Sequence, residues 1–223
     1  MVSTIDVRAE LEGSIRPLRR SEYDRLVELG VFEDEPIELL EGVLVEMSPE
    51  GASHAWVIQE LVQAFSGKLA ANLRLRVGNP LAASKWSEPE PDLAIVPVGD
   101  YRRAHPGTAI LLIEVARTSR RKDLGVKAAI YAAAGVPEYW VFDLDRAVVH
   151  RHRLPTSDGY DEIVVHGPDA TLDACGVDVP LGDLIGEISG EILDNDPTGT
   201  GAGAQPEAEA TARAEPDAGD QTE

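Results

Sequence analysis

The chain has 223 residues and a formal net charge of −20, from 40 acidic and 20 basic side chains. This length suits one domain with a sizeable core. The acidity argues against a broad basic surface for nucleic acid, although it leaves room for a local site where a divalent cation supplies the positive charge. The single cysteine, Cys175, excludes an intrachain disulfide and a cysteine-based zinc cage. No apolar run approaches the roughly 18 residues of a membrane span and no signal sequence is visible, so we expect a cytoplasmic protein with no membrane partner.

The two ends of the chain differ from its middle. Residues 194–223 contain no aromatic or large aliphatic side chain, and they carry eight acids against one arginine. Such a segment cannot bury enough apolar surface to offset its loss of conformational entropy, so it is predicted to be a disordered acidic tail. Residues 1–19 are predicted to be a loose segment, which leaves 20–193 as the folded domain. Without the tail, the chain keeps a charge of −13.

The first part of the predicted domain contains a helix, a hairpin and a longer helix. Ser21 is expected to cap the first helix and Gly30 to end it. Two short apolar strands, 37–40 and 43–47, flank Glu41-Gly42, which predicts a hairpin. The stretch "SHAWVIQELVQAFSGKLAANL" repeats apolar residues at helical spacing and predicts a helix of about five turns.

The second part contains several strands and one further helix. The order of these elements indicates an α/β or α+β fold around a mixed sheet. The expected elements are strands at 73–77, 81–84, 92–98 and 109–116, a helix from Asp123 to Ala134, a strand pair around Leu144–Arg146, and weak strands near 160–165 and 171–179.

The stretch "AILLIEVA", residues 109–116, contains a charged side chain that needs an explanation. Its aliphatic residues predict a strand buried on both faces, yet Glu114 lies among them. An ionised carboxylate in such a strand costs several kcal/mol unless it is paired or bound to a metal. From the residues alone two explanations stay open: an ion pair with Lys127 or an arginine, or a bound divalent cation.

Asp92 is a second acid that could join Glu114. It begins the preceding predicted strand, so pairing of the two strands would bring both carboxylates to one edge of the sheet. A bridging cation would relieve their repulsion, and Mg²⁺ or Mn²⁺ prefers such oxygen ligands. A bound ion of this kind acidifies water and neutralises charge at a phosphodiester. The alternative interpretation of Asp92 is a turn residue that closes the "PEPD" loop.

A lysine would complete a hydrolytic site of this kind. Asp123, Lys127 and Tyr131 are spaced four residues apart and are expected on one helix face. Lys127 is the candidate to orient an attacking water or to stabilise the pentavalent phosphorus.

Four basic residues gather between Glu114 and this helix. They could grip a phosphate backbone, or they could merely offset the acids of the domain. They are Arg117, Arg120, Arg121 and Lys122.

These motifs, in this order and spacing, resemble those of the Uma-two family of endonucleases, in the PD-(D/E)xK or restriction-endonuclease-like superfamily. The resemblance covers about residues 20–190. It lies in "IELLEGVLVEMSPEGASHAWV" from residue 37, "PD" at 91–92, "IEV" at 113–115 and "KDLGVKAAIYAAAGVPEYWVFD" at 122–143.

The resemblance implies a mixed central sheet flanked by helices and a Mg²⁺- or Mn²⁺-dependent endonuclease that cuts nucleic acid, with DNA as the expected substrate. It implies Asp92 and Glu114 as metal ligands, with the Val115 carbonyl as a third. Lys127 would be the catalytic lysine, relocated to the following helix, and Glu38 the upstream acid. Where the family commonly shows a Ser-Pro-Ser-like turn after the glutamate, this chain has "ARTSRR".

Other residues and another function also stay open. His54 is a secondary candidate, as a partner of a metal ligand or a proton shuttle, and Glu41, Asp123 and Tyr131 are further secondary candidates. The competing hypothesis is a catalytically inactive nuclease-fold scaffold whose acidic surface binds a basic protein. A homodimer is compatible with either function.

Overall fold

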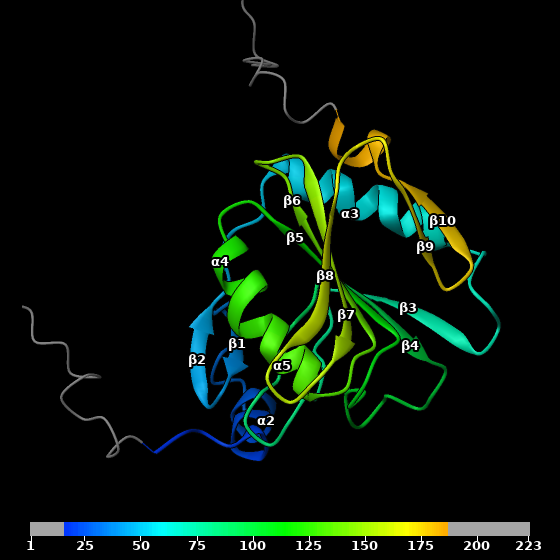
Figure 1. Cartoon of the computed structure of the whole chain (residues 1–223). Helices are drawn as coiled ribbons and strands as arrows, with labels where there is room; N and C mark the ends of the chain where they lie inside the picture. Colours follow the sequence, from blue (N-terminus) through cyan, green and yellow to red (C-terminus); the bar gives the residue numbers. More distant parts are fainter. Residues whose placement is uncertain (1–15, 187–223) are drawn as a thin grey trace, which may run out of the picture. The chain divides into compact units, whose positions relative to one another are not determined.

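The computed structural model describes residues 16–186 (Figure 1). Their centre is a six-stranded sheet in the order β3-β4-β5-β6-β7-β8. Only β5 and β6 are parallel, and every other neighbouring pair is antiparallel. The sheet is therefore mixed, as predicted. Its strands are β3 (Leu73–Val77), β4 (Leu93–Pro97), β5 (Leu111–Ala116), β6 (Glu138–Asp143), β7 (Val148–Pro155) and β8 (Tyr160–His166).

Helices and two small hairpins surround this sheet. The helical elements are α2 (Arg20–Glu28), α3 (Ala52–Phe65), α4 (Arg120–Lys122), the π-helix η1 (Asp123–Lys127), α5 (Ala128–Ala133) and a second π-helix, η2 (Gly182–Gly186). The hairpins are β1 (Ile37–Leu40) with β2 (Val43–Glu46), and β9 (Thr171–Ala174) with β10 (Val177–Pro180).

The side chains of the central strands divide the core into two layers because successive residues of a strand point to opposite faces. Leu111, Ile113 and Val115 of β5 pack in a cluster with α3 and the β9-β10 hairpin. Leu112 and Ala116, on the other face, pack in a cluster with α5 and the first hairpin. Glu114 shares this second face, so its side chain is directed at the α4-η1-α5 helix.

Two predicted helix boundaries were wrong. The first helix begins at Arg20, with Arg19 as its N-cap, because the Glu22 carboxylate accepts a 2.9 Å hydrogen bond from the Arg19 backbone N–H. Helix α3 ends at Phe65 rather than continuing through the whole predicted stretch. Gly67, which follows, has a φ of 72° and cannot extend the helix.

Two strand predictions also differ from the structure. Residues 81–84 form no strand. Instead Ala82 donates a hydrogen bond to the Pro106 carbonyl at 2.9 Å, within a long loop. The predicted strand at 171–179 is the β9-β10 hairpin, which turns at Cys175 and Gly176, with φ angles of 56° and 82°.

The predicted domain boundaries reach beyond the described residues. The acidic tail at 194–223, the end of the domain at 187–193 and the N-terminal segment as far as residue 15 lie outside them. Within residues 16–186, none of the helices has the length and apolar character needed to cross a membrane.

Candidate active site

Glu114 is stabilised in its buried strand by an ion pair. Its Oε1 atom lies 2.8 Å from the Lys127 ammonium and accepts a hydrogen bond from the Tyr131 hydroxyl at 2.9 Å. Lys127 and Tyr131 therefore reach the same atom from one helix face, as their spacing predicted. The ion-pair explanation of Glu114 is the one that the structure shows, and it does not exclude an ion at the second carboxylate oxygen.

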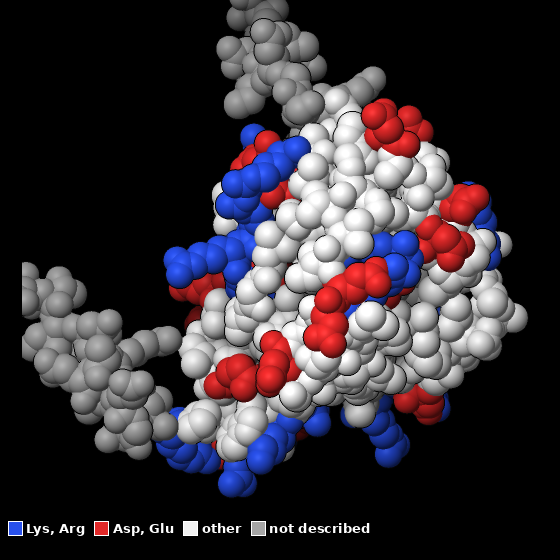
Figure 2. All heavy atoms as spheres, in the orientation of Figure 1, with Lys and Arg blue, Asp and Glu red and all other residues white. Residues whose placement is uncertain are grey.

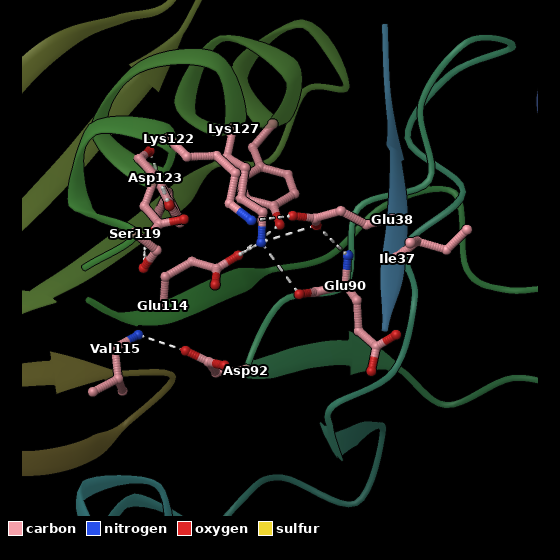
Figure 3. A network of polar contacts seen from close by, with 12 residues as sticks. Ile37, Glu38, Glu90, Asp92, Glu114, Val115, Ser119, Lys122, Asp123 and Lys127 are labelled. Atoms are coloured by element: carbon pink, nitrogen blue, oxygen red, sulfur yellow. Dashed lines mark hydrogen bonds and ion pairs between the residues drawn. The ribbon is translucent and has the colours of Figure 1, made fainter. Parts of the chain in front are cut away.

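Lys127 lies at the centre of the polar network in Figure 3. Besides Glu114, its ammonium contacts Glu38 Oε2 at 3.1 Å and the Glu90 carbonyl at 3.3 Å. Two of its three N–H donors make hydrogen bonds, to Glu114 and to the Glu90 carbonyl, and the contact with Glu38 is an ion pair. Burial lowers the pKa of Lys127, but the charges of Glu114 and Glu38 outweigh that effect and raise it above the ordinary value, so the group is a cation at neutral pH.

Glu38 approaches the same lysine from β1. It is 1% exposed, and its Oε2 also accepts a hydrogen bond from the Glu90 N–H at 3.1 Å. Its Oε1 lies 2.6 Å from the Lys122 ammonium. Glu38 is therefore buried and fully paired. The alternation of residues along the strand would also have allowed an exposed side chain at this position.

The π-helix explains how two lysines reach one glutamate. Lys122 and Lys127 are five residues apart, and in a regular α-helix of 3.6 residues per turn such positions lie on different faces. Segment η1 has i→i+5 geometry, which turns residues five apart toward the same side. Both ammonium groups then contact the Glu38 carboxylate.

Asp92 immediately precedes β4, the strand adjacent to β5. The antiparallel register pairs Leu93 with Ile113, so one residue further along it places Asp92 opposite Glu114. Asp92 Oδ2 accepts a 2.6 Å hydrogen bond from the Val115 N–H and lies 3.2 Å from His54 Nε2. The two acids thus have separate partners, and in Figure 3 Glu114 faces Lys127 while Asp92 faces the Val115 amide.

These side chains surround one pocket of about 280 Å³. Asp92, Glu114, Val115, Lys127, His54 and Asp123 all contribute to its lining. Asp123 accepts a 2.6 Å hydrogen bond from the Ser119 hydroxyl, and burial raises the pKa of its carboxyl group. The pocket brings together six of the nine site residues that the sequence singled out.

Three predicted candidates do not line it, and one of them is Tyr131, which is buried behind Glu114 and donates its hydroxyl to that carboxylate. The Glu38 carboxylate does not line the pocket and reaches it only through Lys122 and Lys127. Glu41 lies in the β1-β2 turn, where its carboxylate accepts a 2.7 Å hydrogen bond from Ser87, and it is not part of this site.

Two residues of the site, Glu50 and Glu90, were not identified from the sequence, and Lys122 was identified only as one of four basic residues that could grip a phosphate backbone. Lys122 was assigned to a basic loop, but it belongs to α4 and contacts Glu38. Glu50 lies 3.5 Å from His54 Nδ1, and Glu90 contributes both backbone groups to the network. The four-residue spacing of Glu50 and His54 was an available signal for Glu50. Only tertiary structure places Lys122 and Glu90 in the site.

A basic surface adjoins the pocket. Lys and Arg side chains gather on the side of the molecule where Figure 1 labels α4 (Figure 2). A hollow of about 390 Å³ lies there, and it shares Arg117 and Thr118 with the pocket. Its charged lining residues are Arg117, Arg120, Arg121, Asp145 and Arg146.

The described residues form a mixed six-stranded sheet with flanking helices. Glu114 lies in β5, Asp92 lies just before β4, and Lys127 lies on the helix beside them. This is a nuclease-like α+β fold of the restriction-endonuclease class. Residues 20–177 match the model of the Uma2 family, described as "Putative restriction endonuclease". The chain belongs to this family.

A solved structure supports the fold. The chain is similar to a protein from Anabaena variabilis ATCC 29413 described as a putative nuclease belonging to DUF820, with a TM-score of 0.62 and 16% sequence identity. The similarity covers 77% of this chain and 99% of that one. A comparison with curated proteins finds no significant match.

Proposed function

We propose that this protein is a metal-dependent endonuclease that hydrolyses phosphodiester bonds in nucleic acid, with DNA as the expected substrate. The observation that carries the proposal is that Asp92, Glu114 and Lys127 line one pocket. The family supports the same reaction class. The adjoining arginines add a surface on which a phosphate backbone could lie.

The donor set of the pocket fits a hard divalent cation. Asp92 and Glu114 would hold Mg²⁺ or Mn²⁺, with the Val115 carbonyl as a third ligand. The contacts of Glu114 with Lys127 and Tyr131 go to Oε1, which leaves Oε2 for an ion. When bound, such an ion acidifies water and offsets the charge of the phosphodiester.

The two lysines have different roles in this proposal. Lys127 fixes the carboxyl groups of Glu114 and Glu38 in place by its contacts of 2.8 and 3.1 Å, and its positive charge stabilises the negative charge that develops at the phosphorus. Lys122 is less buried, with 20% of its side chain exposed, and its ammonium contacts Glu38 Oε1 at 2.6 Å. Its remaining N–H groups could donate to a phosphate oxygen at the pocket mouth.

Nicking of supercoiled plasmid tests the proposal. Purified protein should nick the plasmid when Mg²⁺ or Mn²⁺ is added, and should stop when the ion is chelated. Asp92→Asn should abolish nicking because it removes a carboxylate ligand. Glu41→Gln is the matched control, since that acid lies outside the pocket, and it should cut like the wild type. Equal cutting by the Asp92→Asn variant would refute the assignment.

The scaffold remains the second candidate function. The observation that favours it is that the Lys127 ammonium is buried and already contacts Glu114, Glu38 and the Glu90 carbonyl, as in a purely structural network, within an acidic chain. Titration calorimetry with Mn²⁺ separates the two functions. A scaffold predicts no ion binding that depends on Asp92, whereas the endonuclease predicts binding that Asp92→Asn removes.

A further inference from the structure

His54 is a nitrogen donor that the carboxylate scheme does not use. It lies in the first turn of α3, and its side chain is only 13% exposed. Its ring is placed between two acids: Nε2 lies 3.2 Å from Asp92 Oδ2, and Nδ1 lies 3.5 Å from Glu50 Oε2. One donor atom from each of these three residues lies within 4.8 Å of the others.

The separation of His54 Nε2 and Asp92 Oδ2 suits two ligands of one ion. Donor atoms about 2.1 Å from a common ion, at an angle between octahedral and tetrahedral, are roughly 3.0–3.4 Å apart. The two atoms form a hydrogen bond of 3.2 Å in this structure, and this separation falls within the range. Asp92 is held for such a role by the Val115 N–H, which fixes its carboxylate without occupying every lone pair of the oxygen.

The other ring nitrogen points to the role of Glu50. His54 Nδ1 is buried and has no hydrogen-bond partner within the 16–186 region. If Nε2 bound an ion, Nδ1 would carry the proton and would need an acceptor. Glu50 lies four residues earlier, just before α3 begins, and its Oε2 is only slightly too far for a good hydrogen bond. A carboxylate in this position orients a metal-binding histidine and fixes its tautomer.

We propose that His54 Nε2 and Asp92 bind a divalent transition-metal ion in this pocket, and that Glu50 positions the histidine through Nδ1. The inference deepens the proposed function because it concerns the ion of the same pocket. An imidazole ligand favours ions such as Mn²⁺, Co²⁺ or Zn²⁺ over Mg²⁺, which prefers oxygen donors. The site should therefore select Mn²⁺ over Mg²⁺.

The test measures binding rather than catalysis. Calorimetry with MnCl₂ and with MgCl₂ should show at least tenfold tighter binding of Mn²⁺ to the wild type. His54→Ala should lose most of this preference. Glu50→Gln, which changes an exposed side chain, should weaken Mn²⁺ binding about 10- to 100-fold. His105→Ala is the control, because that histidine lies in a different cluster, near Glu88, and it should bind Mn²⁺ like the wild type.

Pulsed electron paramagnetic resonance of bound Mn²⁺ identifies the ligand directly. Wild-type protein should show ¹⁴N modulation from a coordinated imidazole, and His54→Ala should lack it. Absence of Mn²⁺ binding, or bound Mn²⁺ without ¹⁴N modulation, overturns the inference. Bound Mn²⁺ with this modulation but without plasmid nicking would leave the site standing and would count against the endonuclease alone. Plasmid nicking by a protein whose bound Mn²⁺ shows no ¹⁴N modulation would count against the histidine ligand and leave the endonuclease standing.

Discussion

At the scale of single residues, the central feature is a buried carboxylate matched to a buried ammonium. Glu114 and Lys127 are 4% and 3% exposed. Removing one partner of such a pair leaves the other charge uncompensated, which is much more costly than the net contribution of the pair itself.

Lys127→Met should therefore destabilise the fold strongly. We expect the free energy of unfolding to fall by about 3–5 kcal/mol, measured by urea denaturation. The double variant Lys127→Met/Glu114→Gln should be less destabilised than Lys127→Met alone, because one orphan charge is removed. A loss below about 1 kcal/mol for Lys127→Met, which is the range of an exposed pair, would show that the network is not structural.

A second buried acid predicts a dependence of stability on pH. Glu88 is 5% exposed; burial raises its pKa to about 7, with a further contribution from Asp24 against the opposing effect of Arg20. Between about pH 4.5 and 7 the folded chain holds a proton here that the unfolded chain has released. The free energy of unfolding should therefore fall as pH rises through this window.

Glu88→Gln should remove this fall in the free energy of unfolding with pH, because a glutamine side chain does not titrate. Urea denaturation from pH 4.5 to 7.5 should show a difference between wild type and variant that changes by up to about 3 kcal/mol. A constant difference across that range would mean that Glu88 titrates in the folded chain as it does in the unfolded chain.

At the scale of elements, the β1-β2 hairpin places Glu38 beside the two lysines. Its turn requires positive φ at Glu41 and Gly42, 48° and 76°, as expected for a two-residue hairpin loop. Gly42 is also crowded, because an added Cβ would lie 2.3 Å from the Cβ of Pro17. The turn therefore depends on glycine for two separate reasons.

Gly42→Ala should destabilise the fold by more than backbone strain alone. Gly67→Ala is the matched control, since Gly67 has a φ of 72° but no neighbouring atom within 4 Å. We expect roughly 1–2 kcal/mol for the control and at least about 1 kcal/mol more for Gly42→Ala, from the overpacking. Equal melting temperatures for the two variants would contradict the close approach of Pro17.

The elements also show what local sequence could predict. The hairpin, the buried strand with Glu114 and the strand pair after it follow from apolar patterning and turn residues, and these were confirmed. The π-helix could not be predicted, because "DLGVK" fits an α-helix equally well and tertiary contacts determine its geometry. For the same reason the convergence of Lys122 and Lys127 on Glu38 was missed, although Glu38 and Lys127 were each identified.

At the scale of the whole molecule, an acidic chain presents a local basic surface beside its pocket. The acidity of the chain opposes non-specific binding to nucleic acid, so binding should depend on these few arginines. Arg121 is the most informative of them, because it is exposed and lines the hollow next to the pocket.

Arg121→Gln should reduce the salt dependence of nucleic-acid binding. Each lost phosphate contact lowers the slope of log K against log salt by about 0.9 for duplex DNA. Fluorescence anisotropy with a duplex oligonucleotide in EDTA measures this slope. Arg102→Gln, an exposed arginine outside this hollow, should leave the slope unchanged. Equal slopes for Arg121→Gln and Arg102→Gln would show that the basic surface beside the pocket does not bind nucleic acid.

The most direct test of the central claim is the initial rate of Mn²⁺-dependent plasmid nicking by wild type and by Glu114→Gln, with thermal unfolding of both proteins followed in the same buffer. Glu114→Gln keeps the shape of the side chain and removes its charge. Lys127 still contacts Glu38 at 3.1 Å in this variant, so the protein should be less stable but stay folded. If the pocket hydrolyses phosphodiesters, the variant should nick about a hundredfold more slowly or worse. A folded Glu114→Gln protein that nicks at the wild-type rate would show that the reaction takes place elsewhere.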